Sequence, residues 1–91
     1  MTENRIAMEY VNALCDLVFE CETNRVKIKE VRFLHGGFQV YFEGWEGDAI
    51  CHNYSYGHES GMWETFGFPW DEDDVSTWEA ADLAVMLRDD E

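Results

Sequence analysis

Residues 25–43 read RVKIKEVRFLHGGFQVYFE, and this stretch decides the fold because two strand patterns surround one turn. Residues 35–37, His-Gly-Gly, are typical of a tight β-hairpin. After the turn, Phe38, Val40 and Phe42 alternate with polar or amphipathic residues, so we expect them to share one buried sheet face. The stretch therefore predicts an antiparallel pair of strands.

The strand before the turn has an interrupted alternation. Val26 and Ile28 point to one side, whereas Val31 and Phe33 fall on the opposite parity. A β-bulge near residues 29–30 would bring all four side chains to one face, because one extra residue restores the period of two.

Two further strands are expected downstream. Residues 49–56 form the third, in which Ile50, His52, Tyr54 and Tyr56 would share a face. Residues 62–66 form a shorter fourth strand, which Gly67 and the single proline, at position 69, would end.

A helix is expected on each side of these strands. Residues 3–22 predict an amphipathic helix with a narrow polar stripe. The stripe contains Arg5, Glu9, Asn12, Asp16 and Glu20. Most of the remaining helix surface is apolar, so later segments must cover it or part of it is an interface.

The second helix is expected over residues 77–88. Ser76 with Glu79 three residues later matches a capping box. Ala80, Leu83, Ala84 and Leu87 follow with helical spacing. The order of elements predicts a single α+β domain over residues 1–91, with an N-terminal helix, an antiparallel sheet of three to four strands and a C-terminal helix.

The composition is strongly acidic, with 20 Asp and Glu residues against 6 Lys and Arg, and a formal charge of −14. Binding to phosphates needs clustered cations, so direct contact with nucleic acid or with an anionic membrane is disfavoured. Fourteen aromatic residues argue against disorder. Three cysteines, no signal-peptide pattern and no long apolar stretch predict a protein of the reducing cytoplasm.

The charges are unevenly distributed along the chain. Residues 25–32 hold four of the six cations, whereas residues 43–91 hold 14 acids and only Arg88. One interpretation is an acidic face that imitates the phosphate ladder of DNA. It would combine acidic residues of the helix stripe with the acidic run that follows the fourth strand; these residues are Glu9, Asp16 and Glu20, and Asp71, Glu72, Asp73 and Asp74. The alternative is a solvated surface that only keeps the protein soluble.

Metal binding and catalysis have little support in the sequence. Cys51, His52 and His58 are the best candidate zinc ligands, but no second Cys or His pair has the spacing of a structural site. Carboxylates are abundant without any sign that one is held in an apolar pocket. We therefore expect neither a cofactor nor an enzymatic activity.

Two tryptophans are candidate contacts for a partner. Trp45 and Trp70 flank loops, and aromatic residues beside acids are typical of protein interfaces. Trp63 and Trp78 are expected in the core.

Residues 50–87 carry short patterns that resemble small proteins of bacteriophages and other mobile elements. These patterns are Ser55-Tyr56-Gly57, Gly61, Trp63-Glu64 and Asp73-Asp74-Val75, followed by a short helix. The resemblance implies a mobile-element context, in which small acidic proteins often inhibit host defence or nucleic-acid enzymes. Size, charge and the helix–sheet–helix order are also similar to those of some DNA-mimicking anti-CRISPR proteins.

These observations favour a viral, non-enzymatic inhibitor in the cytoplasm of the host bacterium. It would bind a basic, nucleic-acid-handling host protein, such as a CRISPR effector, through its acidic surface. The alternative is a small structural or accessory protein of a mobile element that forms a homodimer through the helix at residues 3–22.

Overall fold

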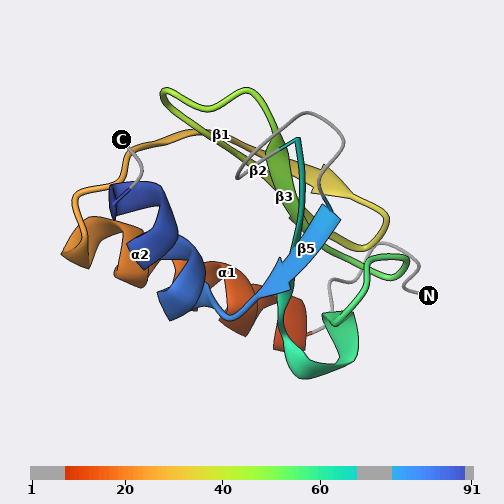
Figure 1. Ribbon diagram of the computed structural model, residues 1–91. Helices are drawn as coiled ribbons and strands as arrows, with labels where there is room; N and C mark the ends of the chain where they lie inside the picture. Colours follow the sequence, from red (N-terminus) through yellow and green to blue (C-terminus); the bar gives the residue numbers. More distant parts are fainter. Residues whose placement is uncertain (1–7, 68–74, 90–91) are drawn as a thin grey trace.

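The computed structural model describes residues 8–67 and 75–89, which form two helices over one face of an antiparallel sheet (Figure 1). In chain order the elements are α1 (Met8–Thr23), β1 (Ile28–Leu34), β2 (Gly37–Phe42), β3 (Asp48–Cys51), the 3-10 turn η1 (His58–Ser60), β4 (Trp63–Phe66), β5 (Val75–Trp78) and α2 (Ala80–Asp89). The α+β class is confirmed, but the sheet has five strands, not three to four, in the order β1-β2-β3-β4-β5.

The β1–β2 hairpin and its bulge are as the sequence predicts. Leu34 pairs with Gly37 around a two-residue turn in which His35 and Gly36 both have positive φ. Glycine adopts this conformation without strain, which suits a turn of this kind. The register shifts between Ile28 and Glu30, so Ile28 and Val31 both lie on the face that the helices occupy.

The core lies between the helices and strands β2 to β4. Its fully buried members include Leu17 of α1, Phe42 of β2, Trp63 of β4 and Leu83 of α2. The Trp63 indole Nε1 donates a hydrogen bond to the carbonyl of Ala13 in α1, over 3.3 Å. Trp63 therefore joins the first helix to the sheet both by its ring and by a polar contact.

The third strand is shorter than predicted, because it ends at Cys51. His52 is buried, whereas Tyr54 and Tyr56 are exposed, so the expected common face is wrong. The Ser55 hydroxyl accepts a hydrogen bond from the His52 N–H and donates one to the His52 carbonyl. Such local bonds satisfy backbone groups that a longer strand would have paired with its neighbour.

The prediction of a helix over residues 77–88 is wrong at its start. Residues 75–78 form β5, and α2 begins at Ala80. Trp78 pairs with Trp63 of β4, and its indole Nε1 donates to the Thr65 hydroxyl over 2.9 Å. An aromatic residue that can join the core and satisfy its own N–H favours the extended conformation over the capping box.

The first helix is described from Met8 to Thr23, and residues 3–7 of its predicted range lie outside the described residues. α1 contacts β2 and α2, while α2 also contacts β5. Strand β1 lies at an edge of the sheet, neither described helix packs extensively against it, and residues 29–33 are all exposed.

Trp63→Ala should lower the free energy of unfolding by about 3–5 kcal/mol, the usual cost of truncating a buried tryptophan. Trp63→Phe should cost less, because it keeps a ring but loses the bond to Ala13. Urea denaturation measures both values. As a matched control, Tyr56→Ala removes a side chain that is 75% exposed and should change stability by about 0.5 kcal/mol or less. Equal effects of the Trp63→Ala and Tyr56→Ala substitutions would contradict the role of Trp63.

Candidate functional site

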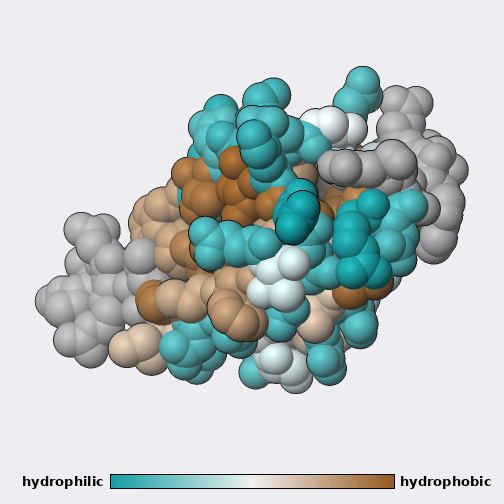
Figure 2. Space-filling view, turned by 90° about the vertical axis from the view of Figure 1, so that its left-hand side faces the viewer, coloured by the Kyte–Doolittle hydropathy of each residue, from teal (hydrophilic) through white to brown (hydrophobic). Residues whose placement is uncertain are grey.

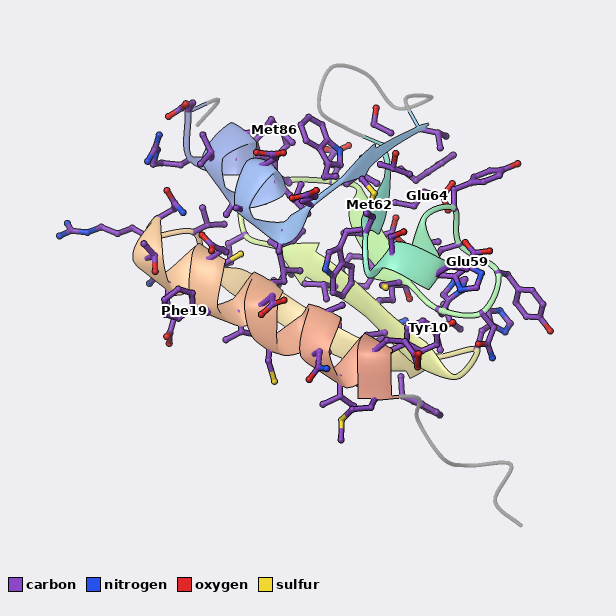
Figure 3. The ribbon with its side chains drawn as sticks, turned by 90° about the horizontal axis from the view of Figure 1, so that it is seen from below. Tyr10, Phe19, Glu59, Met62, Glu64 and Met86 are labelled. Carbon is purple, nitrogen blue, oxygen red and sulfur yellow. The ribbon has the colours of Figure 1, made fainter. Side chains whose placement is uncertain are left out.

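Helix α1 presents three sides of different chemistry. Its core side holds Tyr10, Ala13, Leu17 and Cys21, which are all buried. The acidic stripe lies on the side toward α2 and η1, where Figure 3 places Glu59 and Met62. Phe19 projects away from α2 (Figure 3), although it lies three residues after Asp16 and is therefore a neighbour of the acidic stripe on the helix surface.

A groove runs along the acidic side of α1, against η1 and the start of α2. It consists of two adjoining hollows of about 500 and 310 Å³ that share Asp16, Ser60 and Gly61. Five carboxylate side chains line the two hollows: Glu9, Asp16 and Glu20 of α1, Glu59 of η1, and Glu79 before α2. The predicted stripe therefore forms one wall of a continuous acidic groove.

The electrostatic character of the groove follows from its lining. Among the described residues that line it, none is a lysine or an arginine. Along the helix, Glu9 and Asp16 are separated by about 10 Å and Asp16 and Glu20 by about 6 Å, at a rise of ~1.5 Å per residue. Carboxylates at these separations raise the local negative potential, because no cation of the lining offsets them.

The opposite wall of the groove, η1, is held in place by Tyr10 of α1. Its phenol donates a hydrogen bond to Asn53 Oδ1 over 2.9 Å and lies 2.9 Å from His58 Nδ1. A phenol has one proton, so His58 Nδ1 carries the proton of that second bond. The His58 Nε2 atom lies 3.9 Å from the Glu59 carboxylate.

Glycine lets the chain turn tightly at both ends of η1. Gly57 and Gly61 flank the turn, and both are left-handed, with φ of 81° and 71°. A side chain at either position would be strained, and a Cβ at Gly57 would lie only 3.0 Å from Met62 Cβ. These two glycines allow a three-residue turn to end beside Ala13 of α1.

The described cations lie away from the groove. Arg25, Lys27, Lys29 and Arg32 follow α1 in the connection and in β1, and Arg88 near the end of α2 donates to the Asn24 side chain. The charge separation seen along the sequence is therefore also a separation in space.

Two histidines and a tyrosine form a second cluster at the end of β3. The His35 ring lies 5.0 Å from the rings of both His52 and Tyr54. His52 Nδ1 accepts a hydrogen bond from the Tyr54 backbone N–H, so the proton of the neutral ring is on Nε2. Burial lowers the pKa of His52, and the neighbouring His35 lowers it further.

The candidate zinc ligands are not arranged as a metal site. Within residues 8–67 and 75–89, no group of three or more His, Cys, Asp or Glu side chains could hold a metal ion. Cys51 is fully buried, and burial raises the pKa of its thiol to about 11. At neutral pH this thiol is protonated, which is a poor state for a metal ligand or a nucleophile.

The other predicted contact residues are placed differently. Trp45 is half-buried and packs against the core, so only part of its ring can meet a partner. Trp70 and the acidic run Asp71, Glu72, Asp73 and Asp74 lie outside the described residues. Sequence reasoning missed Glu59 and Glu79 as groove residues, because neither belongs to the periodic stripe of α1.

The chain matches no protein-family model, no curated protein and no solved structure to which it was compared. In the described part of the chain, neither helix has the length and apolar character needed to cross a bilayer.

The protein should lose stability as the pH falls below about 6.5, the usual pKa of an unfolded histidine. The native pKa of His52 lies below that value, so the unfolded chain binds the proton first and unfolding becomes easier. His52→Asn should reduce this dependence, because an amide oxygen can accept the Tyr54 N–H without titrating. Urea denaturation at several pH values measures the effect. The same pH dependence in both proteins would refute the assignment to His52.

Proposed function

We propose that this protein is a non-enzymatic inhibitor that binds a basic, nucleic-acid-handling host protein through the acidic groove of α1. The observation that supports the proposal is the meeting of five carboxylates from α1, η1 and the connection before α2 in one groove whose described lining contains no lysine or arginine. A CRISPR effector in the cytoplasm of a bacterial host is one target of this kind.

The chemistry of the groove suits a cationic ligand. Arginine side chains bind carboxylates through paired, charge-assisted hydrogen bonds, and lysine side chains bind them as point charges. Such side chains normally hold phosphates in a nucleic-acid channel. Carboxylates spaced along α1 would occupy that channel in place of the phosphates and so exclude the nucleic acid.

A surface that only kept the protein soluble would not need carboxylates from separate segments to meet in one groove. Charges that only keep a protein soluble are usually spread out and fully solvated. Here Glu20 is half-buried while the other four groove carboxylates are exposed, and η1 is held against α1 by the 2.9 Å contact between the Tyr10 phenol and His58 Nδ1. The fold thus holds like charges together, which costs stability unless a partner neutralises them.

A second candidate function is that of a homodimeric accessory protein of a mobile element. Met8 and Phe19 of α1 are 68% and 65% exposed. Large apolar side chains exposed on one helix favour a protein contact. This candidate differs from the first in using the side of α1 that faces away from α2.

Neutralising the groove should weaken binding to the target and leave the fold intact. The variant Asp16→Asn, Glu20→Gln, Glu79→Gln removes three charges, and at about 0.5 kcal/mol for each solvent-screened pair it should lower the affinity roughly tenfold. Affinity capture from host cells supplies the target, and its nucleic-acid displacement is then titrated at several salt concentrations. The salt dependence should flatten together with the affinity.

The matched control is Arg25→Ala with Lys27→Ala, which lies outside the groove and should leave inhibition unchanged. A second comparison neutralises residues 71–74 to test whether that acidic run adds to binding. An unchanged affinity and salt slope for the groove variant, with native circular dichroism, would rule out the groove as the phosphate surrogate.

A further inference from the structure

The edge strand β1 and the adjacent side of α1 form an uncovered apolar surface. On the face toward the helices, Val31 and Phe33 are 41% and 55% exposed. A hollow of about 290 Å³ separates the end of α1 from the start of β1, and its apolar lining is Val18, Cys21, Val26 and Ile28. Figure 2 shows hydrophobic side chains gathered across this end of the molecule.

The backbone of β1 also has an open edge. Leu34 and Gly37 flank the two-residue turn, and in such hairpins the flanking residues form the hydrogen-bonded pair. The alternation of an antiparallel ladder then directs the backbone N–H and C=O of Phe33 and Val31 away from β2. An edge of this kind can pair with another strand.

We propose that β1 pairs with β1 of a second copy, antiparallel and centred on Val31. In this register Glu30 of each copy lies opposite Arg32 of the other, and Val31 lies opposite Val31 of the second copy. Opposite charges facing each other across two strands stabilise their pairing. The short segment from Glu30 to Arg32 is therefore complementary to itself.

Neighbouring registers that keep the same backbone alternation are disfavoured. Moving the centre by one residue toward the turn places Arg32 against Arg32, and moving it the other way places Glu30 against Glu30. Like charges directly opposite each other destabilise a strand pair.

Pairing in this register also covers the apolar surface. The two-fold axis passes through the sheet, so both helix layers lie on the same face of one continuous sheet. Val31 and Phe33 of both copies are then enclosed between the two α1 helices. The occupant is thus a second copy because the edge charges match and the apolar side chains on both copies become buried.

This contact is independent of the proposed inhibition. The acidic groove lies between α1, η1 and the start of α2, and none of the residues that line it belongs to β1. It also differs from a dimer built on Met8 and Phe19, because the strand edge sets the register.

A charge-reversal experiment tests the contact. Arg32→Glu and Glu30→Arg each place like charges in both facing pairs, so each variant alone should dimerise at least tenfold more weakly than the natural protein. An equimolar mixture should form a heterodimer, because every facing pair is again of opposite charge. The ion pair of 2.8 Å between Glu30 and Arg32 within one chain is lost in both variants and is not restored by mixing.

Sedimentation equilibrium up to about 200 μM measures association, and native mass spectrometry identifies the heterodimer. Lys27→Glu changes the net charge by as much as Arg32→Glu but lies outside the paired segment, so it should weaken the dimer far less. A monomeric natural protein, variants that dimerise as well as it does, or a mixture that stays monomeric would each overturn the proposal. A dimer that Phe19→Glu dissociates and Arg32→Glu leaves intact would overturn it in favour of a helix contact.

Discussion

The contact between Trp63 and helix α1 is the constraint on which the arrangement of the described residues depends. The indole is fully buried and donates to the carbonyl of Ala13, so α1 can dock on the sheet in only one position along its axis. That position brings Glu9 and Asp16 beside η1 and Glu20 beside the start of α2. The groove exists because a buried aromatic residue in the sheet fixes where a surface stripe of the helix lies.

Two short helices cannot cover one face of a five-stranded sheet. α1 lies over β2, and α2 lies toward β5, so the strand at the opposite edge is left uncovered. The acidic and apolar sides of α1 follow from this arrangement, since one side faces α2 and the other faces the bare strand. A helix packed over β1 would have covered this apolar surface.

Sequence patterns correctly predicted those elements whose structure depends on residues close together in the chain. The hairpin turn at residues 35–37, the bulge before Val31 and the core stripe of α2 follow from spacing alone, and the structure confirms them. The end of β3 at Cys51 and the strand at residues 75–78 could not be predicted in this way. The first depends on hydrogen bonds of the Ser55 side chain, and the second on a partner strand that Trp78 meets only in the folded chain. Glu59 and Glu79 join the groove for the same reason, because three elements must first be packed together.

The packing of α1 against α2 has a consequence for folding during synthesis on the ribosome. Of the described elements, α1 is the first to leave the ribosome and its partner helix α2 is the last. The ribosome adds about 5–20 residues per second, so the core side of α1 stays uncovered for several seconds before α2 has been synthesised. During that time Leu17 and Cys21 have no complete hydrophobic partner surface, so chaperones that bind emerging apolar segments have a defined opportunity to act on this helix.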